Sequence, residues 1–133
     1  LPNNGNALLI HCSDTDDDIS IDAIDIHKMH LNFGWDGIGY HKVICRNGDI
    51  QNGRPEFWVG AHVKGKNTIS LGVCLIGRNS FTTEQFVSLE KVRKKKKKKY
   101  GNVSVLGHRD IVKTKKTCPN FDVKDWCKKI GLS

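Results

Sequence analysis

The sequence predicts one α/β domain with α+β character, in which a central mixed β-sheet is flanked by helices on both faces. Short apolar runs alternate with longer stretches of helical periodicity, a pattern that is typical of a sheet covered by helices. An Asn-Gly turn at 47–48 joins two strand-like segments and predicts an antiparallel hairpin within that sheet. No linker or internal repeat divides the 133 residues, so residues 1–133 are expected to form a single domain.

The first part of the chain predicts a strand followed by a helix. Residues 7–10 are an uninterrupted apolar run, which predicts a buried strand that ends at His11. A helix is expected over about residues 20–33, because apolar side chains recur at helical spacing and Gly34 follows as a stop signal. His30 falls on the apolar face of this helix and is predicted to be a core histidine.

The middle of the chain predicts the hairpin and a central strand. The hairpin would run up over residues 40–45 and return from Ile50, on either side of the Asn-Gly turn. The β-branched, apolar run at 68–76 lies between two glycines and predicts a strand in the centre of the sheet. Gly72 within it indicates close approach of a neighbouring backbone.

The last part of the chain predicts a helix, a strand and a closing helix. Thr82 and Gln85 have the spacing of a capping box, which predicts a helix that runs to about Tyr100. A strand is expected over 103–106, and a final helix over 121–130 would turn its aromatic side chains inward.

The helix that follows Thr82 contains a run of six lysines, residues 94–99. Phe86, Leu89 and Val92 mark its core face, and the same spacing continues to Lys96, where an apolar residue would be expected. Three explanations remain open: the lysine stems lie along apolar surface, the helix leaves the core, or the stretch is not a natural helix.

Composition and charge narrow the classes of function. The formal net charge of +8 includes the six lysines of that run, so the rest of the chain is close to neutral and no nucleic-acid partner is expected. No apolar run is long enough to cross a bilayer, and no signal peptide is visible, so membrane insertion is not expected. Five cysteines without framework spacing predict mostly free thiols.

Three potential metal ligands follow predicted strands or lie on the adjoining loop. His11 and His108 each come after an apolar run, and Cys118 lies in the loop that follows His108. Imidazole nitrogen and thiolate sulfur both suit zinc, and three protein ligands leave a fourth position for a reactive water molecule. The alternative is structural, because a single histidine or cysteine more often packs in a core.

Six motifs occur in order along the chain. They are IHCS (10–13), GWDGIGYHKVICRNGDI (34–50), GAHVKGKNTISLGVCLIG (60–77), FTTEQFVSL (81–89), GHRD (107–110) and KKTCPNFD (115–122). In this order they resemble the zinc-dependent N-acetylmuramoyl-L-alanine amidases, a family that includes phage amidase-type lysozymes and peptidoglycan recognition proteins. The resemblance extends from about Leu8 to Trp126 and implies an amidase-like and peptidoglycan recognition protein-like fold.

The resemblance also implies an activity and a zinc cofactor. Members of this family hydrolyse the amide bond between N-acetylmuramic acid and the L-alanine of peptidoglycan. By position, the zinc ligands would be His11, His108 and Cys118.

Two further residues would be catalytic by the same resemblance, Tyr40 and Lys116. The Lys116 ammonium group could stabilise an oxyanion, and the Tyr40 phenol could orient water or assist proton transfer to the leaving amine. Without the family match, Tyr40 would be interpreted as a packing residue and Lys116 as loop solvation.

The other polar residues of these motifs divide into candidate substrate contacts and structural residues. His62 and Asn67 match family positions that line the substrate cleft, although both could instead be loop-forming residues. His41 should point away from Tyr40 on the same strand and is interpreted as structural, and His27 is expected to face solvent.

The sequence alone leaves two other functions open. A module of the same fold could bind peptidoglycan without cutting it, but the non-hydrolytic members of the family generally lack the cysteine ligand that this chain has at 118. A polymerase-regulating role is known for a phage lysozyme of this family, and no residue here supports that partner. The expected protein is a monomer that is made in the cytoplasm and acts on peptidoglycan at the periplasm or cell wall.

Overall fold

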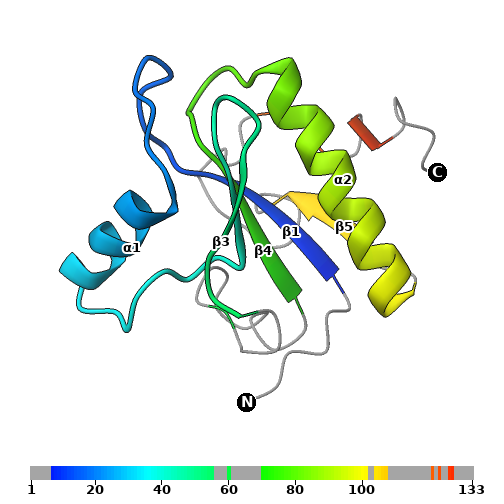
Figure 1. The fold of residues 1–133 in the computed structure, drawn as a ribbon, viewed down its shortest axis with the longest axis horizontal. Helices are drawn as coiled ribbons and strands as arrows, with labels where there is room; N and C mark the ends of the chain where they lie inside the picture. Colours follow the sequence, from blue (N-terminus) through cyan, green and yellow to red (C-terminus); the bar gives the residue numbers. More distant parts are fainter. Residues whose placement is uncertain are drawn as a thin grey trace.

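The computed structural model describes residues 7–55, 60, 70–101, 104–107, 121, 123, 126 and 127. Within these residues one mixed five-stranded sheet carries two long helices (Figure 1). The elements in chain order are β1 (Ala7–Cys12), α1 (Ala23–Asn32), β2 (Lys42–Ile44), β3 (Ile50–Asn52), β4 (Ser70–Leu75), α2 (Thr83–Tyr100) and β5 (Ser104–Gly107). The predicted fold class is therefore confirmed.

The sheet has the strand order β3-β2-β4-β1-β5. β1 is parallel to both of its neighbours, β4 and β5, and β2 is parallel to β4, whereas β3 returns antiparallel to β2 as the Asn-Gly turn predicts. The carboxyl ends of β1, β2, β4 and β5 therefore meet at one edge of the sheet.

The two helices cover opposite faces of the sheet, as the sequence predicts (Figure 1). On one face, Leu89 and Val92 of α2 pack in the same core cluster as strand residues such as Ile10. On the other face, Ala23 and Ile26 of α1 pack with strand residues that include Val43 and Cys74. Alternate strand residues point to opposite faces, so β2 and β4 contribute to both cores, whereas Ala7 and Leu9 of β1 form a separate small cluster with Leu106 of β5.

Both helices begin with capping boxes. Thr82 caps α2: its hydroxyl accepts from the Gln85 amide at 3.0 Å, and the Gln85 side chain accepts from the Thr82 amide at 3.0 Å. This box is the one that the sequence predicts. α1 begins at Ala23, later than the predicted start near residue 20, because Asp22 forms a similar box with Asp25.

The lysine run continues the helix. Lys96 is only 5% exposed, although the lysines on either side of it are exposed. Position 96 therefore belongs to the inner face, as the spacing predicts, and α2 continues to Tyr100 without leaving the core at this point. Of the predicted closing helix, Val123, Trp126 and Cys127 are described and are helical, and Phe121 and Trp126 pack against the α2-side core.

Candidate functional site

His11 lies on β1, an inner strand of the sheet, with 2% of its surface exposed. The strand runs through His11 to Cys12, so the prediction that it ends at His11 is one residue too short. Cys74 of β4 is the register partner of His11, and the alternation of the strand places both on the face that α1 covers. The backbone of β1, which is paired with β4 at His11 and with β5 up to Ile10, therefore holds this imidazole in place.

Tyr40 lies beside His11, although the two residues are far apart in the sequence. Their ring centroids are 5.1 Å apart, with the planes tilted by 50°. On its other side Tyr40 contacts the ring of His30 at 5.5 Å, and His30 in turn contacts Trp35 at 4.5 Å. A row of rings therefore leads from the buried His11 to the exposed Trp35.

The other predicted site residues lie outside the described residues. These are His108, Cys118, Lys116, His62 and Asn67. Among the described residues, no group of three His, Cys, Asp or Glu side chains could hold a metal ion. The described end of β5 is relevant to the zinc hypothesis. Gly107 of β5 is the register partner of Ile10 of β1. In the sequence, His108 directly follows Gly107 and His11 directly follows Ile10.

The segment before Tyr40 is held by two histidines of α1. The His27 Nδ1 accepts from the Ile38 amide at 3.1 Å, and the His30 Nδ1 accepts from the Gly39 amide at 2.9 Å. His27 is exposed and His30 is buried, as the sequence predicts. Their contacts with the backbone were not predicted, and the only sequence signal is the spacing of two histidines by about one helical turn ahead of a glycine-rich segment.

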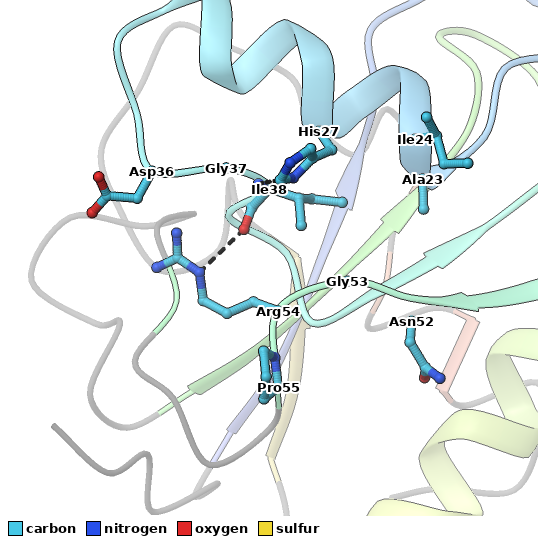
Figure 2. Close-up of a pocket in the computed structure, with 10 residues that line it drawn as sticks. All are labelled: Ala23, Ile24, His27, Asp36, Gly37, Ile38, Asn52, Gly53, Arg54 and Pro55. Atoms are coloured by element: carbon cyan, nitrogen blue, oxygen red, sulfur yellow. Dashed lines mark hydrogen bonds between the residues drawn. The ribbon is translucent and has the colours of Figure 1, made fainter.

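The end of the hairpin holds the same segment from the other side. The Arg54 Nε donates to the Ile38 carbonyl at 3.1 Å, as Figure 2 shows, and the Arg54 amide donates to the Tyr40 carbonyl at 2.8 Å. A side chain at Gly53 would overlap that same Tyr40 carbonyl oxygen. Glycine is therefore needed at position 53 for the backbone to approach Tyr40.

A pocket of about 450 Å³ opens between the start of α1 and the end of β3 (Figure 2). Its walls carry the side chains of His27, Asp36 and Arg54 beside apolar groups that include Ile24 and Ile38. The segment that leads to Tyr40 thus forms one wall of a surface pocket.

His41 has the structural role that the sequence predicts. It is buried, its amide donates to the Gly72 carbonyl at 2.9 Å, and its Nδ1 accepts from the Gly72 amide at 3.0 Å. The close approach of a neighbour at Gly72 is thereby accounted for by the residue that follows Tyr40. Both sides of Tyr40 along the chain are consequently held by imidazole groups.

Burial controls the protonation of the groups around Tyr40. It lowers the pKa of His30, and the positive charge of Arg54 lowers it further, so the neutral imidazole is favoured. Burial raises the pKa of the Cys74 thiol, and a hydrogen bond with the Tyr40 side chain opposes that shift. Cys74 is accordingly a neutral core thiol in contact with Tyr40.

Acidification is expected to destabilise the fold through His30. Because its pKa in the folded protein lies below the ordinary value of 6.5, the unfolded chain binds more protons as the pH falls through this range. The stabilisation of the folded state by neutral His30 is complete above about pH 6.5, and it is lost as the pH falls through the pKa of His30 in the folded protein. Urea unfolding at about pH 7 and about pH 5 measures this loss. The loss should be smaller in His30→Asn, which cannot be protonated there, and an equal loss would contradict the assignment.

Comparison with known proteins gives a consistent set of relatives. A family profile described as N-acetylmuramoyl-L-alanine amidase matches residues 2–121. The endolysins of Escherichia phage T7 and Enterobacteria phage T3 are 35% and 36% identical to this chain, over 96% and 95% of it and 88% and 87% of their own lengths. The solved structure of the amidase LysC from Clostridium intestinale URNW has a TM-score of 0.86 at 29% identity, over 98% of this chain and 88% of that one. Bumblebee PGRP-SA, with a TM-score of 0.80 at 23% identity over 96% of this chain and 85% of that one, shares the fold.

Proposed function

The chain belongs to the N-acetylmuramoyl-L-alanine amidase family, and from this premise we propose how its residues carry out the reaction. The protein is a lytic amidase that hydrolyses the bond between N-acetylmuramic acid and L-alanine in peptidoglycan. Its substrate is an uncharged amide, which resists attack by water unless a strong nucleophile is supplied and the carbonyl oxygen is stabilised.

We propose that His11, His108 and Cys118 hold a zinc ion. Zinc in such a site would lower the pKa of a bound water molecule and polarise the amide carbonyl. The donor set suits this ion, because two imidazoles and one thiolate are ordinary zinc ligands and leave a position free. The support from the described residues is that His11 is fixed and buried beside Tyr40, and that the register pair Ile10–Gly107 directly precedes the two histidines in the sequence.

Tyr40 and Lys116 have distinct proposed roles. The Tyr40 phenol both donates and accepts hydrogen bonds, so beside His11 it can orient the attacking water or move a proton toward the leaving amine. Lys116 would place an ammonium group near the carbonyl oxygen, where negative charge develops during attack. His62 and Asn67 would contact the substrate. The observation that carries this proposal is the 5.1 Å contact between the His11 and Tyr40 rings.

Chelation is the direct test of the zinc proposal. Purified protein is expected to release peptides that begin with L-alanine from cell walls, to lose this activity with a strong zinc chelator, and to regain it when zinc is restored. Mass spectrometry of the released peptides identifies the bond that was cut. Undiminished hydrolysis by metal-free protein would contradict the zinc mechanism, and binding to walls without peptide release would contradict hydrolysis.

The place of action follows from the substrate. Peptidoglycan lies in the cell wall, and the endolysins similar to this chain belong to phages that infect bacteria. Among the described residues no helix is long and apolar enough to cross a membrane. We propose that a single copy of the chain carries the complete site, because its expected ligands and catalytic groups all lie within residues 11–118.

A further inference from the structure

We propose that His30 is a positioning residue for Tyr40, an inference that rests on the proposed catalytic role of Tyr40. The His30 Nδ1 accepts from the amide of Gly39, the residue directly before Tyr40, at 2.9 Å. The His30 ring also contacts the Tyr40 ring at 5.5 Å. One buried imidazole thus holds both the backbone that carries Tyr40 and the ring itself.

The hydrogen bond requires a particular form of His30. An imidazole can accept at Nδ1 only when that nitrogen is unprotonated, which places the proton of the neutral ring on Nε2. The bond is buried, so a lost acceptor would leave the Gly39 amide without a partner, which is unfavourable away from water. The segment would move to recover a partner, and Tyr40 would move with it.

The surrounding contacts show why such a movement would reach the reactive groups. The Tyr40 ring lies between two imidazoles, with His11 at 5.1 Å and His30 at 5.5 Å. From the hairpin side, the Arg54 amide holds the Tyr40 carbonyl at 2.8 Å. If the His30 contact is lost, the backbone can pivot about the Arg54 contact and carry the phenol away from His11. A displacement of about 1 Å in a catalytic group can lower the rate about 10²-fold.

His27 provides a matched comparison within the same helix. It makes the same kind of bond one turn earlier, because its Nδ1 accepts from the Ile38 amide at 3.1 Å. His27 is exposed, so water can replace it as the acceptor, and the amide that it holds is one residue farther from Tyr40. Loss of His27 should therefore displace the segment before Tyr40 much less than loss of His30 does.

Replacement of His30 by asparagine or by glutamine distinguishes a positioning role from a general need for a polar side chain at this position. The Oδ1 of His30→Asn can occupy the place of Nδ1, whereas the acceptor of His30→Gln lies one bond farther out. With soluble muropeptide as substrate, His30→Gln is expected to lower kcat about 10²-fold with little change in KM, because the lost contact acts on the reacting group. The kcat of His30→Asn and that of His27→Asn should each stay within about 5-fold of the wild-type value, which is a small change compared with the loss expected in His30→Gln.

A spectroscopic measurement tests the hydrogen bond without reference to activity. In uniformly ¹⁵N-labelled protein, a scalar coupling between the Gly39 amide nitrogen and the His30 Nδ1 should be detected across the bond. The coupling should vanish in His30→Asn, in which oxygen is the acceptor, while the Gly39 amide keeps its protection from hydrogen exchange. In His30→Gln that protection should fall, with the His41–Gly72 contact as an internal reference for the intact fold.

The outcomes distinguish this inference from the proposed function. Tyr40→Phe should lose activity if the phenol is catalytic, and full activity in that variant would overturn the role of Tyr40 and the positioning role with it. If Tyr40→Phe loses activity but folded His30→Gln keeps the wild-type kcat, the positioning role alone is overturned. Equal losses in His30→Asn and His30→Gln, or no coupling between Gly39 and His30 in the wild type, would overturn it as well.

Discussion

Replacement of His11 by alanine is expected to remove zinc and hydrolysis together. The imidazole is buried on β1 and has the Tyr40 ring against it, so no solvent-exposed group can readily take its place. With two ligands left, the ion would be held too weakly to remain during purification. The loss of kcat/KM should exceed the roughly 10²- to 10³-fold cost of a single missing transition-state donor. Elemental analysis and peptide release from cell walls measure the two effects.

Matched variants separate ligand loss from damage to the fold. Cys118→Ser is expected to lose zinc in the same way, whereas Cys127→Ser, whose thiol is half-buried against the α2-side core, should retain it. His30→Asn should also keep its metal, because His30 is proposed to act on Tyr40 alone. Equal zinc loss in Cys118→Ser and Cys127→Ser would show that the wrong thiol had been assigned as the ligand.

Of the substitutions proposed for this protein, Leu89→Ala is expected to cause the largest decrease in the free energy of unfolding. Leu89 is 0% exposed and lies in the core between α2 and the sheet. Truncation of a buried leucine removes its transfer free energy and leaves a cavity, which together cost about 2–5 kcal/mol. The total free energy of unfolding of a domain of this size is about 5–15 kcal/mol. Leu89→Ala should therefore unfold at a clearly lower urea concentration, with a similar dependence of the free energy of unfolding on urea concentration.

Val87→Ala is the control on the same helix. The Val87 side chain is 52% exposed, so its truncation should change the free energy of unfolding by no more than about 0.5 kcal/mol. Both replacements move to the higher helix propensity of alanine, and the gain is larger for valine than for leucine, so propensity does not account for a loss of stability in Leu89→Ala. If the two variants were destabilised equally, α2 would not pack on the sheet through Leu89.

The sequence predicts the elements whose signals are local. Apolar runs predict β1 and β4, the Asn-Gly turn predicts the β2–β3 hairpin, and the Thr82–Gln85 box predicts the start of α2. The start of α1 is predicted too early, because several acidic and polar residues before Ala23 could serve as caps and only the fold selects Asp22. The strand order is not local either, since it depends on which apolar faces meet.

The site is predictable only in part. Spacing alone suggests that His11 could be a ligand, and the family resemblance alone adds Tyr40. Their contact arises from tertiary packing, because β1 and the segment that leads into β2 are brought together across β4. The backbone contact of His30 has no sequence signal beyond its spacing from His27, since a histidine on the apolar face of a helix predicts burial and leaves its hydrogen-bond partner undefined.

The place of β1 between β4 and β5 determines when the sheet can be completed during synthesis. Of the five described strands β1 is the first to be synthesised, but its two neighbours are β4 and β5, and the last pairing joins Ile10 to Gly107. Until β5 has emerged, one hydrogen-bonding edge of β1 has no strand partner in the nascent chain, and pairing between segments so distant is slow. The sheet that carries His11 can therefore be completed only after β5 has been synthesised.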